Sequence, residues 1–313
     1  MKTPWCLLFP GQGSQSIGMG ADLVRQFPEV ARTFEEASDA LNFDVQKLCF
    51  EGSEEALALT ENCQPAILTV SIGAWRALSS RIEINADWAI GHSLGEYSAL
   101  VVAEAMSFSE AVKAVRERGK LMQQAVAVGI GGMLALLGGE KESAYKLADE
   151  SSSADNRCWP ANFNGPGQIV LSGHLKALET ASKRSKDFGF RRAVFLNVST
   201  PFHCPLMKPA ADGLADALRL VHFDHPIFKV IHNVTGLPSN ESSDIYSLLI
   251  RQVTSPVLFD QCVSYAASEG AACFLEVGPG NVLSGLVKRI SASDVILNFS
   301  QVDDLNVVME MMN

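Results

Sequence analysis

The sequence predicts an α/β protein in which a small domain is inserted into a larger, discontinuous one. Both ends of the chain alternate short apolar segments with helical patterns, whereas the middle runs strand, helix, strand, strand, helix, strand. The chain has 313 residues, which is enough for one large domain or two unequal ones. We therefore expect the large domain to comprise residues 1–130 and 200–313, and the inserted domain residues 131–199.

The first part of the large domain is expected to contain two buried strands. Residues 4–9 are a short apolar run that ends at a Pro-Gly pair, and residues 86–90 are a second run that leads into Gly-His-Ser-Leu-Gly. Helical patterns cover residues 20–41, 54–80 and 96–106, and later strand patterns cover residues 228–231, 273–277 and 295–297. This alternation of strands and helices predicts an α/β domain.

The middle of the chain has its own arrangement. Strand patterns cover residues 133–137, 159–163, 168–172 and 190–198, and helical patterns cover residues 142–150 and 175–187. The resulting βαββαβ order is that of a ferredoxin-like domain. Gly131-Gly132 and Ser199-Thr200-Pro201 bracket this segment and are the expected crossing points between the domains.

The composition excludes several classes of protein. Hydrophobic residues make up 47% of the chain, which excludes a disordered protein. Lys and Arg (25) are outnumbered by Asp and Glu (35), and the net charge of −10 disfavours binding to nucleic acid or to an anionic membrane. The sequence contains no apolar stretch of about 18 residues and does not begin like a signal peptide. We expect a cytoplasmic protein.

The seven cysteines and six histidines show no pattern typical of a metal site. No two cysteines have CxxC spacing, and the histidines lack HExxH spacing. We therefore expect neither a metal nor a disulfide framework, and we expect most of the cysteines to be buried as small apolar residues.

A serine nucleophile is predicted at Ser93. The motif Gly91-x-Ser93-x-Gly95 lies between a predicted strand and a predicted helix, which is the context that a nucleophile elbow requires. The two glycines allow the backbone to turn sharply around a serine in a strained conformation. The first amides of the following helix would then face a developing oxyanion.

A serine hydroxyl needs a base within hydrogen-bond reach, and two histidines are candidates. His92 adjoins Ser93, but neighbouring side chains at a turn point in different directions, so we expect His92 to pack under the turn. His203 lies between Pro201 and Pro205 in the loop that follows the inserted domain, and it is the preferred candidate. From its surroundings alone, His203 could equally be a hydrogen-bonded, partly buried histidine.

An arginine falls on the apolar face of the helix that is expected to begin after Ser107. Ser107 and Glu110 form a capping box, and steps of three and four residues lead from Val115 through Arg118 to Met122. A buried guanidinium keeps its proton and needs an anionic partner. That partner could be an internal carboxylate or the carboxylate of a ligand, unless the side chain snorkels to solvent.

The loop after the first strand begins with Gly11-Gln12-Gly13 but does not match a dinucleotide-binding fingerprint. Ser16 stands where the third glycine would be, and GxxxxGK[ST] does not occur in the sequence. We expect this loop to offer a backbone N–H to an oxyanion instead.

Six motifs follow one another along the chain. They are Phe9-Pro10-Gly11-Gln12-Gly13-Ser14-Gln15, GHSLGEYSAL (residues 91–100), RGKLMQ (residues 118–123), Pro201-Phe202-His203, RQVTSP (residues 251–256) and EVGPG (residues 276–280). At this spacing they resemble the malonyl-CoA:acyl-carrier-protein transacylase family over nearly the whole chain. The resemblance implies an α/β-hydrolase-like large domain with a ferredoxin-like insertion.

The resemblance also implies roles for the candidate residues. Ser93 would attack the thioester of malonyl-CoA, and His203 would serve first as base and then as acid. Arg118 would pair with the malonyl carboxylate. The malonyl group would then pass to the phosphopantetheine thiol of an acyl carrier protein in a ping-pong mechanism. The other implied positions are the backbone amides of Gln12 and Leu94 as an oxyanion hole, Met122 beside the acyl group, Gln64 and Asn162 lining or supporting the pocket, and a backbone carbonyl near Gln252 that orients His203.

Phe202 precedes the histidine where many bacterial members have serine, and phenylalanine there accompanies malonyl selection in related polyketide acyltransferases. The sequence leaves open whether the pathway is fatty-acid or polyketide synthesis.

Three alternative functions remain: an acyl hydrolase of this fold, an acyltransferase subunit of a malonate decarboxylase and a non-catalytic binding subunit. Arg118 argues against the hydrolase, and the pair Ser93 and His203 against the binding subunit. The resemblance implies a monomer without a permanently bound cofactor.

Two short basic clusters stand out in this acidic chain. Lys183, Arg184 and Lys186 lie in KRSKDFGFRR (residues 183–192), and Lys288-Arg289 is a second cluster. Each could be a solvated helix face. Because carrier proteins are typically acidic, one of the clusters is a candidate docking site for the carrier protein.

Overall fold

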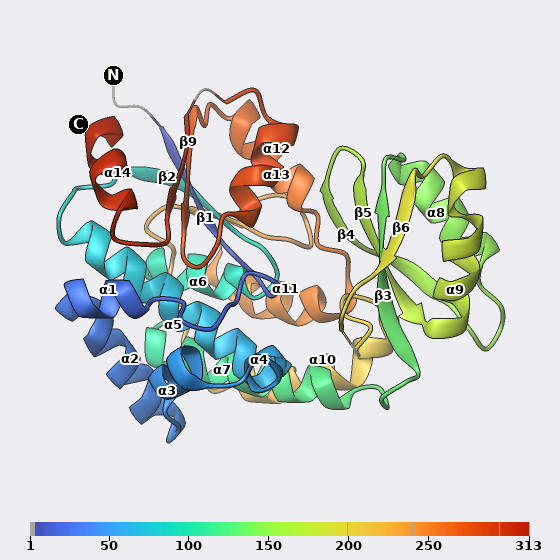
Figure 1. The fold of residues 1–313 in the computed structure, drawn as a ribbon, viewed down its shortest axis with the longest axis horizontal. Coiled ribbons are helices and arrows are strands. Elements are labelled where there is room, and N and C mark those ends of the chain that lie inside the picture. The colour runs from blue at the N-terminus through green and yellow to red at the C-terminus, as the bar shows by residue number, and fades with distance from the viewer. Residues whose placement is uncertain (1–3, 199, 240, 294, 313) are drawn as a thin grey trace.

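The computed structural model describes residues 4–198, 200–239, 241–293 and 295–312. Within these residues the strands form two separate sheets, a five-stranded parallel sheet and a four-stranded antiparallel sheet. Figure 1 shows the small sheet beside the large one, with helices packed around both. The predicted mixed α/β fold is confirmed.

The elements that the sequence predicts occur in the predicted order, with some differences in their bounds, and further helices lie between and after them. Before the small sheet, the elements are β1 (Trp5–Phe9), α1 (Ala21–Gln26), α2 (Pro28–Leu41), α3 (Val45–Glu51), α4 (Glu54–Ala58), α5 (Thr60–Ser79), β2 (Ala86–Gly91), α6 (Gly95–Val102) and α7 (Phe108–Gln124). The small part contains β3 (Gly131–Leu137), α8 (Lys141–Glu150), β4 (Cys158–Gly165), β5 (Gln168–His174), α9 (Leu175–Arg184), the 3₁₀ helix η1 (Ser185–Phe188) and β6 (Arg192–Phe195). The rest comprises η2 (Pro205–Met207), α10 (Lys208–Leu218), β7 (Lys229–Ile231), α11 (Ser242–Thr254), α12 (Phe259–Ser268), β8 (Cys273–Val277), α13 (Val282–Ile290), β9 (Val295–Phe299) and α14 (Asp304–Met312).

Strand β1 lies at the centre of the large sheet, whose order is β7-β2-β1-β8-β9 with all neighbours parallel. Leu7 and Phe9 point into the larger core, which includes residues of α2, α5 and α7. Cys6 and Leu8 point into a second core, which includes residues of α12 and α13. Burial on both faces explains why β1 is a continuous apolar run rather than an alternating one.

The loops that follow β1 and β2 leave the same edge of the large sheet. Phe9 pairs with Gly91 in the register of the two strands, and the N–H of His92 donates to the carbonyl of Phe9 at 3.0 Å. The Gln12 loop and the Ser93 turn therefore start side by side. This carboxyl edge is where parallel sheets commonly bind ligands.

The small sheet has the order β4-β5-β3-β6, and all its neighbouring strands are antiparallel. Its βαββαβ sequence of elements is the one expected of a ferredoxin-like domain. Leu134 and Leu136 of β3 belong to the core beneath α8 and α9, whereas Met133 joins the core of the large part. The domain boundaries at residues 131 and 199 stay a prediction, and Ser199 lies outside the described residues.

Three helical patterns are interrupted or shortened. Helix α1 ends at Gln26, and Pro28, a residue favoured in the first turn of a helix, opens α2. The second predicted helix is divided at Leu59, which adopts a non-helical backbone between α4 and α5. Helix α6 ends at Val102, two residues before Glu104, whose φ of 58° is left-handed. The predicted cap of α7 is confirmed, because the N–H of Glu110 donates to Ser107 Oγ at 3.2 Å.

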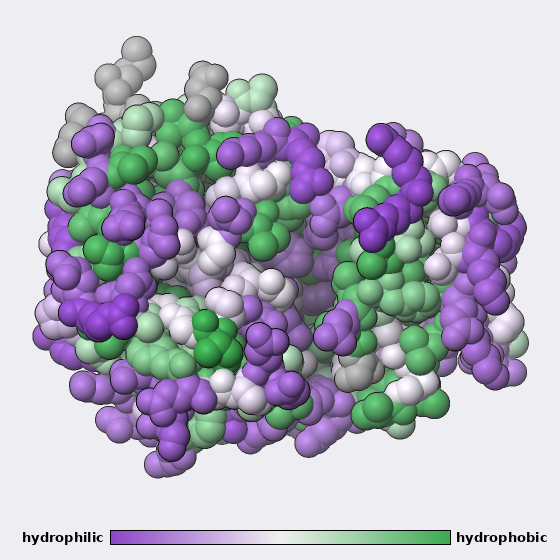
Figure 2. All heavy atoms as spheres, in the orientation of Figure 1, coloured by the Kyte–Doolittle hydropathy of each residue, from purple (hydrophilic) through white to green (hydrophobic). Residues whose placement is uncertain are grey.

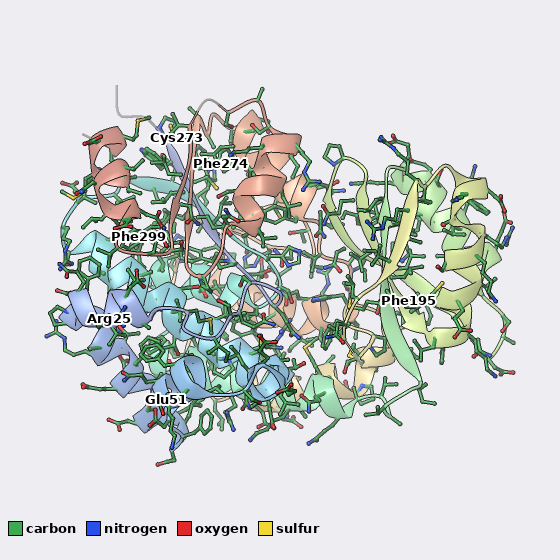
Figure 3. The ribbon with its side chains drawn as sticks, viewed as in Figure 1. Arg25, Glu51, Phe195, Cys273, Phe274 and Phe299 are labelled. Atoms are coloured by element: carbon green, nitrogen blue, oxygen red, sulfur yellow. The ribbon has the colours of Figure 1, made fainter. Side chains whose placement is uncertain are left out.

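The surface is mostly hydrophilic and is hollowed between the large and small parts (Figure 2). Some apolar side chains remain exposed, among them Phe195 at the end of edge strand β6 (Figure 3). All seven cysteines lie in the described part of the chain, where they are buried and form no disulfide bond. Over the same residues, no His, Cys, Asp or Glu cluster is arranged to hold a metal ion, and no helix combines the length and apolar character needed to span a membrane.

Candidate active site

The turn at Ser93 is held by backbone contacts that leave no room for larger residues. Ser93 has a φ of 53°, and the site of a Cβ on Gly91 would lie only 1.8 Å from the carbonyl carbon of Gly95. A Cβ on Gly95 would lie 2.1 Å from the carbonyl oxygen of Phe9. The two glycines of the motif are therefore required, one by the turn itself and the other by its contact with β1. The sequence places Ser93 in a strained turn at the carboxyl edge of β2.

Asn233, in the loop after β7, also holds this turn through side-chain hydrogen bonds. Its side-chain oxygen accepts the N–H of Ser93 at 2.7 Å, and its amide nitrogen donates to the carbonyl of Gly91 at 2.7 Å. Asn233 is fully buried. Asn233 could not be predicted from the sequence, because an isolated asparagine in a loop carries no motif.

His203 is placed as a base for Ser93. Its Nε2 lies 2.8 Å from Ser93 Oγ, and its Nδ1 lies 2.8 Å from the backbone carbonyl of Gln252. Because a carbonyl can only accept, Nδ1 must carry the proton, and Nε2 is left free to accept the proton of the serine. The backbone carbonyl that was expected near Gln252 is that of Gln252 itself, and it contacts His203 Nδ1.

The protonation of His203 is set by its surroundings. Burial, followed by the positive charge of Arg118, lowers the pKa of His203 from 6.5 to about 3. His203 also has a left-handed backbone, with a φ of 58°. The imidazole is consequently neutral at physiological pH, which is the form that a general base requires.

Arg118 is buried beside the same hydroxyl. Its Nη2 donates to Ser93 Oγ at 3.0 Å and to Gln252 Oε1 at 2.9 Å, and its Nη1 donates to Gln64 Oε1 at 2.8 Å. With 1% of its surface exposed, the side chain does not snorkel to solvent. Among the described residues no carboxylate contacts the guanidinium directly, and Nε has no partner. Donors of a buried cation thus remain available to an anionic ligand.

Ten of the predicted site residues line one cavity of about 170 Å³. They are Gln12, Gln64, His92, Ser93, Leu94, Arg118, Met122, Asn162, Phe202 and His203. Gln252 lies behind this group and reaches it through its hydrogen bonds to Arg118 and His203. The structure therefore gathers residues from seven separate stretches of the sequence around one hydroxyl.

The opposite wall of this cavity comes from the small part of the chain, of which only Asn162 was predicted to belong to the site. Met133 of β3, Val170 of β5 and the segment after β6, with Leu196 and Val198, supply mostly apolar side chains. Met133 and Val170 lie on the face of the small sheet that α8 and α9 leave uncovered. Strand alternation could have indicated this face, but not that it closes the pocket.

His92 packs beneath the turn, as expected. Its Nε2 lies 2.9 Å from Asn164 Oδ1, and its ring is tilted against that of Phe259. Burial lowers the pKa of His92. Asn162, two residues before Asn164 on β4, forms a parallel bridge with Val257 and so helps to join the small sheet to the large part.

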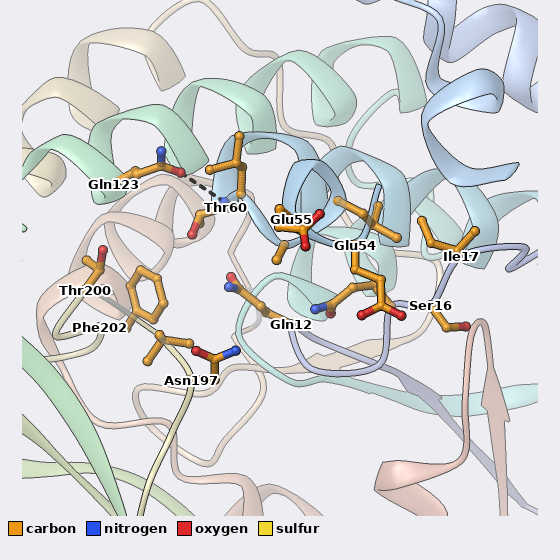
Figure 4. A pocket seen from close by; sticks show the side chains of 15 residues that line it. Gln12, Ser16, Ile17, Glu54, Glu55, Thr60, Gln123, Asn197, Thr200 and Phe202 are labelled. Carbon is orange, nitrogen blue, oxygen red and sulfur yellow. Dashed lines mark hydrogen bonds between the residues drawn. The ribbon is translucent and has the colours of Figure 1, made fainter. Parts of the chain in front are cut away.

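A larger outer cavity, of about 620 Å³, continues from the inner one. The two share Gln12, Val198 and Phe202. Figure 4 shows Phe202 and Asn197 on one side and Gln12 on the other, with Gln123 accepting the N–H of Thr60 above them in this view. An extended group in the outer cavity would therefore lie next to the cavity that contains Ser93.

The basic clusters do not belong to this site. Lys183 and Arg184 end α9, Lys186 lies in η1, and the other cluster is in the last turn of α13. Arg184 is engaged in an ion pair with Glu150 at 2.6 Å. Neither cluster lines the inner or the outer cavity.

Known proteins share this arrangement over nearly the whole chain. Residues 6–308 match the acyl transferase domain family. The malonyl CoA-acyl carrier protein transacylase of Bacillus subtilis is 46% identical over 91% of this chain and 89% of its own length. The enzyme of the same name from Salmonella typhimurium is 44% identical over 92% and 93%. The chain belongs to the malonyl-CoA:acyl-carrier-protein transacylase family.

Solved structures of this transacylase family agree with the fold. The transacylase from Coxiella burnetii superposes with a TM-score of 0.97 at 39% identity, covering 100% of this chain and 98% of that one. A malonyl-transacylase solved in complex with a type II PKS acyl-carrier protein gives a TM-score of 0.96 at 41% identity, over 99% and 100%. The solved relatives therefore contain both of the sheets found in this protein.

Proposed function

We propose that this protein transfers a malonyl group from malonyl-CoA to the phosphopantetheine thiol of an acyl carrier protein through an ester on Ser93. The observation that carries the proposal is the buried guanidinium of Arg118, 3.0 Å from the hydroxyl that would be acylated. A cation at this position gives a carboxylated acyl group a partner that a neutral acyl group cannot use. The names of the relatives support the same donor and acceptor.

In the first half-reaction, Ser93 Oγ attacks the thioester carbonyl while His203 Nε2 takes the hydroxyl proton. The backbone amides of Gln12 and Leu94 are proposed to receive the oxyanion, since both residues line the cavity beside Ser93. The carbon–sulfur bond then breaks, and the thiolate of CoA leaves with the proton held by His203. The malonyl ester stays on Ser93 with its carboxylate against Arg118.

The second half-reaction reverses these steps with a different thiol. The phosphopantetheine thiol gives its proton to His203 and attacks the ester carbonyl, and the carbon–oxygen bond to Ser93 breaks as His203 returns the proton. Met133, Val170 and Leu196 give the inner cavity apolar walls, which disfavour water in competition with the thiol. No permanently bound cofactor is needed, because the phosphopantetheine arrives on the partner.

An acyl-CoA panel tests this function. We expect intact-protein mass spectrometry to show a malonyl adduct after mixing with malonyl-CoA, no adduct in Ser93→Ala, and transfer of the adduct to holo acyl carrier protein. Acetyl-CoA and butyryl-CoA should acylate Ser93 far more slowly. A malonyl adduct lost to water faster than to the carrier thiol would favour an acyl hydrolase, and failure to form any adduct would favour a binding subunit.

We further propose that the carrier protein docks on the small part of the chain. Residues 131–199 carry nine Lys and Arg against seven Asp and Glu, whereas the rest of the chain carries 16 against 28. Lys183 and Lys186 are exposed there, near the end of α9. Opposite potentials steer an acidic partner towards this surface.

Charge reversal tests the docking surface. We expect Lys183→Glu/Arg184→Glu/Lys186→Glu to raise the KM for carrier protein about tenfold at low salt, with unchanged acylation by malonyl-CoA. Lys288→Glu/Arg289→Glu is the matched comparison, because it reverses the other exposed basic cluster. Transfer kinetics equal to wild type in the first variant, with a raised KM in the second, would move the docking surface to α13.

That the protein is a monomer and lies in the cytoplasm stays a prediction from the sequence.

A further inference from the structure

The active site contains a buried carboxylate that the reaction above does not use. Glu96 is the second residue of α6, directly after the turn that holds Ser93, and its side chain is fully buried. Its Oε2 accepts the N–H of Asn233 at 2.9 Å and the side-chain Nε2 of Gln252 at 2.8 Å. Its Oε1 lies 2.8 Å from His232 Nδ1. Burial of a carboxylate is unfavourable unless hydrogen bonds and a nearby positive charge compensate it.

The amide of Gln252 connects this carboxylate to the arginine. Its Nε2 faces Glu96, and its Oε1 accepts from Arg118 Nη2 at 2.9 Å. The amide dipole is therefore aligned with its positive end towards the carboxylate and its negative end towards the guanidinium. Burial lowers the pKa of Arg118, and the charges of Tyr97 and then Glu96 oppose this shift.

We propose that Glu96 is the counter-charge of Arg118, acting through the Gln252 amide, and that it sets how strongly the pocket prefers a carboxylated acyl group. This inference rests on the proposed function. A carboxylate in direct contact would occupy the donors of the guanidinium and exclude the substrate. Separation by one amide compensates the buried cation while engaging a single N–H of Nη2, and Nε, which has no partner, remains as a donor for the acyl carboxylate. Glu96 is thus a positioning residue that acts through Gln252.

Glu96→Gln removes the charge while it can keep the hydrogen bonds. The new amide oxygen can replace Oε2 and accept from Asn233 and Gln252, and the new NH₂ can donate to His232 Nδ1 in its unprotonated tautomer. Without the negative charge, the field of Arg118 at the bound carboxylate is stronger. The ratio of kcat/KM for malonyl-CoA to that for acetyl-CoA should therefore rise about tenfold. Any change in the reactivity of Ser93 or His203 alters kcat/KM for both acyl-CoA substrates and therefore cancels in this ratio.

Glu276→Gln is the matched control. Glu276 is also a fully buried glutamate, but it accepts the N–H groups of Leu283 and Ser284 at the start of α13 and has no hydrogen bond to the site. The Glu276→Gln variant should lose stability and keep the wild-type ratio of kcat/KM for malonyl-CoA to that for acetyl-CoA. A folded Glu96→Gln variant with an unchanged or lower ratio overturns the proposal, and so does an equal rise of the ratio in both variants.

A stability cycle tests the same pairing without substrate. The free energy of unfolding is measured by urea denaturation for Glu96→Gln, Arg118→Gln and the double variant. Each single change leaves one buried charge without compensation, so the double variant should lose less stability than the sum of the two. Additive losses, or a double variant that is unfolded where Arg118→Gln alone folds, overturn the proposal. Loss of the malonyl adduct in wild type would instead reject the proposed function and leave this result standing.

Discussion

Replacing Arg118 with alanine is expected to lower kcat/KM for malonyl-CoA by about two to four orders of magnitude. Two charge-assisted hydrogen bonds to the acyl carboxylate contribute about 1.5–3 kcal/mol each, and about 1.4 kcal/mol corresponds to a factor of ten. Acetyl-CoA has no such carboxylate, so its slow reaction with Ser93 should persist or increase. Stopped-flow or quenched-flow acylation with both donors measures the two rates on the same protein.

Arg116→Ala provides a matched control on the same helix. Arg116 donates to Asn62 Oδ1 at 3.2 Å and lies over the ring of Phe43, and it does not line the inner cavity. It should therefore retain wild-type selectivity between donors. If Arg118→Ala keeps wild-type malonyl transfer, or if both donors lose the same factor, Arg118 does not bind the acyl carboxylate.

His203→Gln is expected to lower the rate of Ser93 acylation by about two to four orders of magnitude for malonyl-CoA and acetyl-CoA alike. Glutamine can occupy the same space and accept the serine hydroxyl, but it cannot take up the proton. In wild type, the rate with a neutral donor should remain high well below pH 6.5. The reason is that a histidine base is lost only as the pH falls through its pKa, and burial holds the pKa of His203 at about 3.

His92→Gln separates the role of the base from that of a neighbouring imidazole. Its contacts are with Asn164 and the ring of Phe259, so its replacement should affect thermal stability more than the rate of acylation. A His203→Gln variant that retains wild-type acylation would remove His203 from the mechanism. A large loss in His92→Gln, with Tm unchanged, would assign the base to His92 instead.

Strands that are buried on both faces could be predicted from the sequence almost residue by residue. Strand β8 covers the predicted residues 273–277, and β2 differs from the prediction by one residue. In both cases a mostly apolar run between polar turns indicated a strand buried in a parallel sheet. The edge strand β6 is shorter than predicted, and its residues are only partly buried or exposed, so apolar composition overstated its length.

The chemistry of the site was predictable where a single segment carries it. The spacing around Ser93 and the position of Arg118 on an apolar helix face follow from local geometry. The partners of Arg118 do not, because Gln64 and Gln252 lie 54 and 134 residues away in sequence and meet it only in the folded protein. Glu96 stood within a recognised motif, yet only its contacts with Asn233 and Gln252 show what the carboxylate does.

The two walls of the inner cavity come from different parts of the chain. Ser93 and Arg118 stand on the large part with Gln252, whereas Met133, Val170 and Leu196 stand on or beside the small sheet. The groups that react with the acyl group and bind its carboxylate are thereby separated along the polypeptide from apolar side chains that face them across the cavity. We expect exchange of side chains on the small sheet to change the space available to the acyl group while the hydroxyl, the base and the cation keep their spacing. For protein engineering, the small sheet is the module to diversify and the large one the module to leave intact.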